Sequence, residues 1–356
     1  MINKQLKFFF CLTLALSTFQ FLLAGNPVTR TSEEIVIYPP PPDSARIQFL
    51  TSISNSTDII GKRNRFLRYI LGEQETLPIF KPYGITSSKG KIYICDTQLG
   101  GIEIIDLQKN EFSYFKPIGR GQIIKPVNCA LDENGYLYVA DTERNQIVIF
   151  DNQLKYLRSF GDPDKFKPTD VAYHDGKLWV CNLKAKQIQV YNKETMRLLF
   201  TFPKVSQNDS GYLFSPTNLY VTDQNTYVSD FGDFKIKIYS QDGKYETSIG
   251  SYGQSPGQFV RPKGIAVDLD HNLYVADAGF ENVQIFDRQG QLLLFFGGSY
   301  TGSGDMWLPA KVALDYENLS YFQKYVDRSF KLKYLIFVTN QFGPDKVNVY
   351  GFIEYR

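Results

Sequence analysis

Six short polar side chains close one recurring pentapeptide, and they are the first candidates for chemistry in this chain. The pattern reads LYVAD at Leu137–Asp141 and again at Leu273–Asp277, with four near-copies elsewhere. Its final residues are Asp96, Asp141, Asn182, Asp230, Asp277 and Asn340. A carboxylate can act as a catalytic acid or base, or it can accept backbone N–H groups and fix a turn. Because six equivalent copies suit a structural role better than one active centre, we expect these residues to cap turns.

A second polar set lies two positions after each of six prolines. Its members are Gly84, Asn128, Asp170, Asn218, Gly264 and Lys311. Asn128, Asp170 and Asn218 come from three consecutive repeats and offer amide and carboxylate oxygens, which suit a hard cation such as Ca²⁺. If the repeats form a ring, these side chains face its central channel. The alternatives are a Ca²⁺ site and a polar channel filled with water.

Basic residues gather around the same prolines and form a candidate binding rim. The rim consists of Lys81, Lys125, Arg144, Lys167, Arg261 and Lys263. An acidic peptide or glycan would suit such a rim, and the alternative is an ordinary solvated surface of mixed charge. Without Lys4 and Lys7 the chain has 37 basic and 37 acidic residues. This balance argues against a nucleic-acid partner, which requires a surplus of positive charge.

A long-period repeat must position these residues. The six prolines are Pro82, Pro126, Pro168, Pro216, Pro262 and Pro309, at intervals of 44, 42, 48, 46 and 47 residues. Each repeat reads as four short strands, a to d, joined by turns that contain Gly or Asn. In the fifth repeat these strands are Gly264–Asp268, Leu273–Asp277, Val283–Asp287 and Leu292–Phe296. Largely apolar a and b strands indicate sheets that are buried on both faces.

The two ends of the chain complete each other. The last repeat ends with Val347–Tyr355 as its strand c and has no strand d, whereas Arg46–Ser54 is a strand that precedes the first proline. Pairing the two segments in one sheet would close a ring without free edges. The sequence therefore predicts an all-β fold, a six-bladed β-propeller over residues 44–356 whose N-terminal strand d pairs with the C-terminal strands a to c.

The repeats resemble a known family. The stretch GQSPGQFVRPKGIAVDLDHNLYVADAGFENVQIFDRQGQLLLFFG resembles the NHL repeat, and the resemblance extends over about residues 44–356. It is similar to exported bacterial propellers of this type. Six-bladed lactonases hold channel calcium with Asn and acidic residues, and peptide-amidating lyases hold zinc with channel histidines. The only histidines here, His174 and His271, fall in a–b turns, so that zinc chemistry is not expected.

The N-terminal region reads as an export signal followed by a spacer. A basic start precedes the apolar run Phe8–Ala24, and we expect residues 1–25 to be a cleaved signal peptide or an uncleaved anchor. Residues 26–43 end in YPPPPD and predict a stiff polyproline spacer. The protein is thus expected in the periplasm or outside the cell, tethered to the membrane only through an uncleaved segment. Cys95, Cys129 and Cys181 are expected to be buried, unpaired thiols.

These patterns favour a binding module over an enzyme. Two repeats depart from the rest, with an expected amphipathic helix around Phe66–Leu71 and an insertion between strands a and b of the sixth repeat. No Ser–His–acid set is apparent. We expect an exported, non-catalytic binding or scaffold propeller that recognises a protein or peptide on the face carrying its d–a and b–c connections. The alternative is a calcium-dependent hydrolase or lactonase with Asn128, Asp170 and Asn218 around the ion.

Overall fold

The computed structural model describes residues 35–61, 69, 72 and 75–356. Residues Val36–Arg356 form one compact unit. The expected signal peptide and the expected helix around Phe66–Leu71 lie outside the described residues. Within the described residues, no helix has the length and apolar character needed to cross a membrane.

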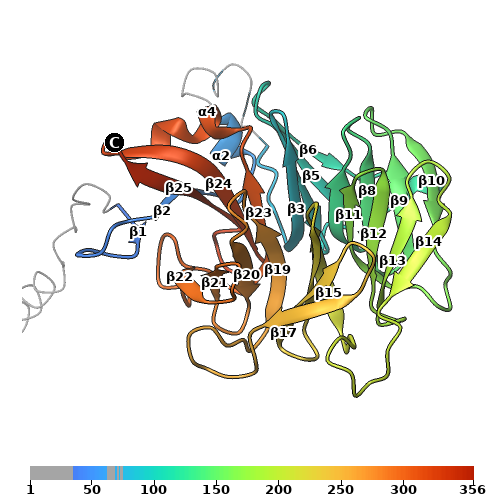
Figure 1. Ribbon diagram of the computed structural model, residues 1–356. Helices are drawn as coiled ribbons and strands as arrows, with labels where there is room; N and C mark the ends of the chain where they lie inside the picture. The colour runs from blue at the N-terminus through green and yellow to red at the C-terminus, as the bar shows by residue number, and fades with distance from the viewer. Residues whose placement is uncertain (1–34, 62–68, 70–71, 73–74) are drawn as a thin grey trace, which may run out of the picture. The chain divides into compact units, whose positions relative to one another are not determined.

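The chain forms six antiparallel sheets arranged around a common centre, so the predicted six-bladed β-propeller is confirmed (Figure 1). Five blades are built from four consecutive strands each. Blade 1 contains β3 (Pro82–Ser88), β4 (Lys91–Asp96), β5 (Gly101–Asp106) and β6 (Glu111–Phe115). Blade 2 contains β7 (Pro126–Leu131), β8 (Leu137–Asp141), β9 (Gln146–Phe150) and β10 (Tyr156–Phe160), preceded by the 3-10 helix η1 (Gly119–Gly121).

The next three blades repeat this order. Blade 3 contains β11 (Pro168–His174), β12 (Lys177–Asn182), β13 (Gln187–Asn192) and β14 (Leu198–Phe202). Blade 4 contains β15 (Pro216–Val221), β16 (Asn225–Asp230), β17 (Lys235–Ser240) and β18 (Tyr245–Ile249). Blade 5 contains β19 (Pro262–Val267), β20 (Leu273–Asp277), β21 (Asn282–Phe286) and β22 (Leu292–Gly297). The first strand of each blade is innermost and the fourth is outermost.

Blade 6 joins the two ends of the propeller, as the sequence predicts. Its strand order is β1–β2–β25–β24–β23, from β1 (Ile37–Tyr38) and β2 (Ile47–Ile53) to β25 (Val347–Tyr355), β24 (Phe330–Asn340) and β23 (Pro309–Asp315). β2 and β25 run antiparallel, with Ile47 opposite Phe352 and Ile53 opposite Val347. The segment expected as a spacer contributes the short edge strand β1, and its Tyr38 hydroxyl donates to the Gly304 carbonyl at 3.0 Å.

The insertion in blade 6 braces the face opposite the d–a and b–c connections. It contains α4 (Leu319–Phe322) and the 3-10 helix η2 (Gln323–Tyr325). The short helix α2 (Thr57–Ile60) follows β2 in the first d–a connection. Phe322 packs on Phe337 with ring centroids 5.8 Å apart. The Asn318 side chain accepts the Gly90 N–H at 2.7 Å. The insertion therefore extends the a–b hairpin and ties the closing blade to blade 1.

Blades pack through columns of small, buried side chains. Cys95, Cys181 and the equivalent residues of the other four blades are fully buried. Cys95, Cys129 and Cys181 are buried free thiols, as predicted. Small residues at this position let neighbouring sheets approach closely while larger side chains fill the space on either side.

The innermost strands approach one another most closely at two glycines. A Cβ atom on Gly264 would lie 2.4 Å from the Cα of Lys311, and one on Gly84 would lie 2.6 Å from the Cα of Asn128. Both obstacles are backbone atoms of the next blade, which cannot move without displacing a strand. Glycine at these two positions therefore sets how tightly the ring closes around its axis.

We expect Gly264→Ala to lower the free energy of unfolding by about 2–3 kcal/mol, because the added methyl group overpacks the ring against β23. Guanidinium denaturation of the purified chain measures this change. Gly302→Ala is the control, since no atom lies within 4 Å of the Cβ it would add. Equal stability of the two variants would contradict the close approach of β19 and β23.

Candidate ligand-binding face

One polar side chain per blade organises the face that carries the d–a and b–c connections, here called the loop face. In blade 5 the Asp277 carboxylate accepts the N–H groups of Val260 at 2.8 Å and Arg261 at 3.0 Å, from the d–a loop. It also accepts the Gly279 N–H at 2.7 Å, in the b–c turn. The predicted capping of the b–c turn is confirmed here and for Asp96, Asp141 and Asn182, whereas the Asp230 side chain accepts backbone N–H groups of the preceding loop only. The Asp277 side chain holds both the turn and the preceding loop.

Strand register explains why this side chain reaches both loops. In all six blades the proline that starts strand a lies directly opposite the residue that ends the LYVAD-like strand, as in Pro262 opposite Asp277. Asp96, Asp141 and Asp230 bind the two residues before their prolines in the same way. In blades 3 and 6 the capping residue is Asn, and its Oδ1 atom accepts only one N–H group from the d–a loop. Each side chain is almost completely buried.

This arrangement places the predicted basic rim on the loop face. The main-chain N–H groups of Lys81, Lys125 and Arg261 are held by the buried carboxylates. Lys125, Lys167 and Arg261 are exposed, whereas Lys81 and Lys263 are partly buried. Arg144 has a structural role instead, because its guanidinium donates to the carbonyl groups of Arg120 and Gln122 in the d–a loop.

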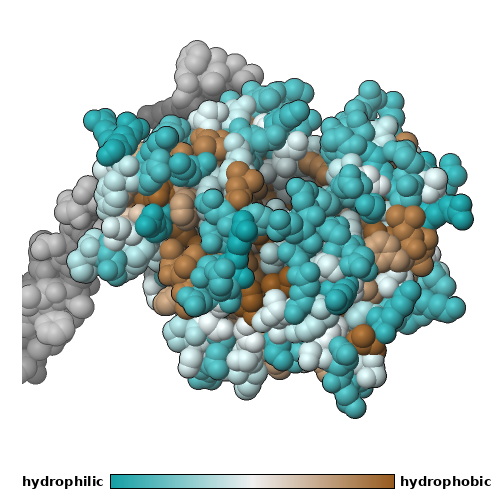
Figure 2. All heavy atoms as spheres, in the orientation of Figure 1, coloured by the Kyte–Doolittle hydropathy of each residue, from teal (hydrophilic) through white to brown (hydrophobic). Residues whose placement is uncertain are grey.

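Exposed apolar side chains also concentrate on the loop face. Eight of the nineteen exposed large apolar residues in the described part of the chain lie in its loops: Phe80, Ile118, Ile124, Val205, Phe231, Tyr252, Trp307 and Phe342. Only Leu269 and Tyr316 lie in the connections of the opposite face. Figure 2 shows small hydrophobic patches between hydrophilic residues on the side of the molecule in view.

The sequence carries a signal for these residues that composition does not reveal. Phe80, Ile124 and Trp307 each lie two positions before a blade-starting proline, and Phe231 directly follows a capping aspartate. Phe80, Ile124 and Trp307 are exposed beside the capping side chains, whereas the equivalent Phe166 of blade 3 is buried. The charge pattern of the sequence therefore predicts the basic rim but not its aromatic component.

The aromatic side chains form two groups on the rim. Phe234 packs on Tyr252 with centroids 4.8 Å apart and on Phe231 at 6.2 Å, at the boundary of blades 4 and 5. In blade 6, Trp307 stacks on Tyr300 with centroids 6.1 Å apart. Contacts of this kind hold exposed rings in fixed positions, which reduces the entropy lost when a ligand covers them.

A small recess accompanies the first aromatic group on blade 5. It has a volume of about 200 Å³ and is lined by Gln254, Ser255, Pro256, Phe280, Asn282, Gln284 and Phe295. The buried Asn282 Oδ1 has no hydrogen-bond donor within the described structure. Pro256, Phe280 and Phe295 give the recess an apolar wall, and its volume suits a single side chain.

The central channel brings together the three residues expected to bind a cation. The Asp170 Oδ2 atom accepts from Asn218 Nδ2 at 3.3 Å and from the Leu219 N–H at 3.1 Å. The Lys311 ammonium, which comes from blade 6 on the opposite side of the ring, lies 2.6 Å from the same oxygen. Asn128 Nδ2 donates to the Thr169 carbonyl at 2.8 Å.

Lys311 changes the chemistry of this group. Its ammonium already neutralises the only carboxylate of the trio, so Ca²⁺ would have to displace a buried cation to reach Asp170. Among the described residues no cluster of three His, Cys, Asp or Glu side chains could hold a metal ion. Beyond Lys311 the inner strands enclose a cavity of about 220 Å³. His174 lies away from the channel and pairs with Asp223 at 3.2 Å.

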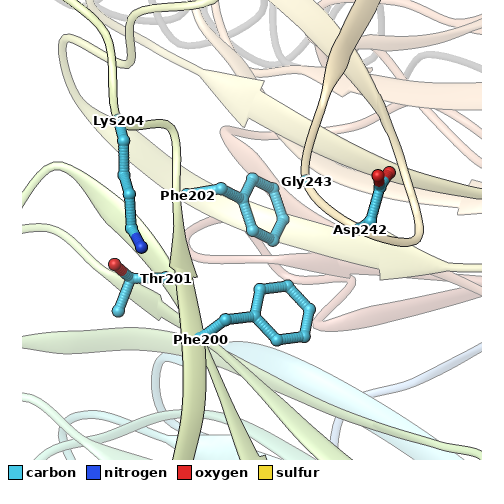
Figure 3. A pocket seen from close by; sticks show the side chains of 6 residues that line it. All are labelled: Phe200, Thr201, Phe202, Lys204, Asp242 and Gly243. Carbon is cyan, nitrogen blue, oxygen red and sulfur yellow. The ribbon is translucent and has the colours of Figure 1, made fainter.

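A third recess lies between blades 3 and 4 (Figure 3). It has a volume of about 280 Å³. Phe200 and Phe202 project from β14 toward the hairpin that carries Asp242 and Gly243, while Lys204 lies on the other side of the strand. A Cβ on Gly243 would lie 2.6 Å from the Phe202 side chain, so the ring packs directly on the turn. The lining thus joins two blades and directs no group of polar atoms at a ligand.

The fold is shared with known propellers. Residues 180–351 match a family model described as a six-bladed β-propeller. A structural genomics protein of unknown function from Bacteroides thetaiotaomicron is similar, with a TM-score of 0.58 and 16% identity over 87% of this chain and 76% of that chain. A catalytically inactive virginiamycin B lyase from Staphylococcus aureus, with quinupristin, has a TM-score of 0.53 and 15% identity over 77% and 95% of the chains. No curated protein matches the sequence.

We expect Asp277→Ala to destabilise the protein by about 2–4 kcal/mol, because several buried backbone N–H groups lose a charged acceptor. Hydrogen exchange should rise in residues 258–261 and 278–281 and stay unchanged in blade 2. Asp277→Asn keeps one acceptor oxygen, as Asn182 and Asn340 do naturally, and should cost less than half as much. Equal losses in the two variants would show that the capping bonds do not hold the loop face.

Replacing Lys311 by Met should cost about 3–5 kcal/mol, because the buried Asp170 carboxylate loses its counter-charge. The double variant Lys311→Met/Asp170→Asn should recover part of this loss. Thermal unfolding with and without millimolar Ca²⁺ provides a second measurement. Ca²⁺ should stabilise only the single variant, and stabilisation of the wild type would mean that the ion displaces Lys311.

Proposed function

We propose that this chain is an exported, NHL-type propeller that binds a protein or peptide partner through its loop face and performs no catalysis. The observation that carries the proposal is the joint concentration of exposed aromatic rings and basic side chains on that face. The described connections of the opposite face carry only two exposed large apolar residues, Leu269 and Tyr316.

The composition of the loop face is that of a recognition surface. Aromatic residues and Arg are enriched where proteins bind one another, because they bury a large area at low entropic cost. Tyr252 is 65% exposed and Trp307 is 48% exposed, yet each ring is held by an aromatic neighbour. Rigid, exposed rings on a closed ring of sheets provide a surface prepared for binding.

The partner segment should combine acidic and apolar side chains. Lys81, Arg261 and Lys263 favour acidic groups near the channel, while the two aromatic groups favour apolar contacts farther out. The recess lined by Pro256, Phe280 and Phe295 has the size to receive one side chain. A peptide that crosses blades 5 and 6 would meet all of these features.

The paired channel residues support a binding role over hydrolysis. A calcium-dependent hydrolase would need an accessible carboxylate to hold the ion and polarise a substrate. Here Asp170 is 1% exposed, and its carboxylate lies 2.6 Å from the Lys311 ammonium. The group is arranged as a buried ion pair that bridges opposite blades.

Export is part of the same proposal. The basic start and the apolar run Phe8–Ala24 support passage through a membrane. A partner would therefore be met in the periplasm or outside the cell. Tethering through an uncleaved N-terminal segment would keep the loop face close to a membrane without changing its chemistry.

Affinity capture from the native envelope tests the binding face. Tyr252→Ala/Trp307→Ala should weaken binding of captured partners at least about tenfold, because truncating interface aromatics costs more than 1 kcal/mol each. Leu269→Ala is the matched control, as Leu269 is 78% exposed on the opposite face. Partners that bind the double variant as well as the wild type, or that are lost from the control, would refute this use of the loop face.

A further inference from the structure

Three cationic side chains from two blades meet at the channel mouth on the loop face. Lys81 precedes the proline of blade 1, and Arg261 and Lys263 flank the proline of blade 5. Blade 6 separates these blades, and its residue equivalent to Lys263 is the buried Ala310. Because this residue is small, the Lys263 side chain can pass over it toward blade 1. Its Nζ atom lies 5.1 Å from the centroid of the Tyr83 ring.

Aromatic rings hold two of the cations without neutralising them. Lys81 Nζ lies 4.8 Å from the centroid of the Phe342 ring, and Lys263 Nζ lies over Tyr83. The face of an aromatic ring attracts a cation but carries no net charge. Among the ion pairs formed by the described residues, none includes Lys81, Arg261 or Lys263.

The surroundings of Lys263 disfavour its charge. Burial, followed by the positive charges of Arg261 and Lys81, lowers the pKa of Lys263 to about 8. The next carboxylate along the channel, Asp170, already pairs with Lys311. Charges that repel one another and lack a counter-ion contribute little to folding, and such arrangements are characteristic of sites that bind an opposite charge.

We infer that Lys81, Arg261 and Lys263 form an anion subsite that receives carboxylate groups of an acidic partner segment. The Arg261 guanidinium can bind a carboxylate through two parallel hydrogen bonds, and the two ammonium groups can bind a second one. The neighbouring rings of Tyr83 and Phe342 supply apolar contact beside the charges. The inference deepens the proposed function and rests on it for the identity of the natural ligand.

Short blocked peptides test the subsite without the natural partner. The probes are acetyl-Glu-Glu-Trp-amide, acetyl-Ala-Ala-Trp with a free carboxyl group, and acetyl-Gln-Gln-Trp-amide, each titrated calorimetrically into the full chain. At least one of the two carboxylate-bearing probes should bind. If only the Glu probe binds, the subsite recognises side-chain carboxylates; if only acetyl-Ala-Ala-Trp binds, it recognises a C-terminal carboxylate. Binding of the Gln probe as strongly as both others, or binding of no probe, would overturn the subsite.

Variants locate the binding on the surface. Lys263→Met should weaken binding of the carboxylate probes at least about tenfold, because it removes a charge-assisted hydrogen bond. Lys81→Met should act in the same direction. Lys155→Met is the control, since Lys155 is an exposed lysine in the c–d turn of blade 2, on the opposite face. Equal affinity of Lys263→Met and the wild type would overturn the assignment.

Stability in buffer free of multivalent anions provides a second readout. Since the Lys263 charge is disfavoured in the fold, Lys263→Met should unfold at the same temperature as the wild type or at a higher one at pH 7. Citrate should stabilise the wild type more than this variant. A lower unfolding temperature for the variant would show that Lys263 is compensated and would overturn the subsite. Failure to capture a natural partner would instead refute the proposed function alone.

Discussion

The structure depends on one buried oxygen acceptor per blade, placed where the second strand ends. The side chains of Asp96, Asp141, Asn182 and Asp277 accept backbone N–H groups from the turn that follows them and from the loop that precedes the opposite strand. Asp230 and Asn340 accept backbone N–H groups from the preceding loop only. These N–H groups would otherwise be buried without partners, at a cost of about 1–3 kcal/mol each. The same bonds therefore stabilise the blade and give the loop face a fixed shape.

Closure of the ring adds a second constraint that acts across the whole propeller. β2 pairs with β25, so the first and last parts of the described fold share one blade. Gly84 and Gly264 let the inner strands approach until backbone meets backbone. At the centre Lys311 reaches Asp170 on the opposite blade. This ion pair joins blades 3 and 6 across the centre of the ring.

The loop face combines a stable frame with a locally unfavourable charge distribution. Rings such as Tyr252 and Trp307 stay exposed although they could have been replaced by polar residues without loss of core packing. Lys263 holds its charge beside two other cations and has no acidic partner among the described residues. These features are the physical basis of the binding function proposed above for the loop face.

The sequence by itself determined the number of blades, the strands within each blade, the capping role of Asp96 and its equivalents, and the joining of the chain ends. These features follow from local periodicity and turn residues, which repeat along the chain and are readable one blade at a time. Tertiary structure alone decided that Lys311 meets Asp170, which is 141 residues away, and that Lys263 passes over blade 6 to reach Tyr83. Contacts between blades that are not neighbours depend on ring diameter, side-chain length and side-chain direction, and the repeat pattern encodes none of these.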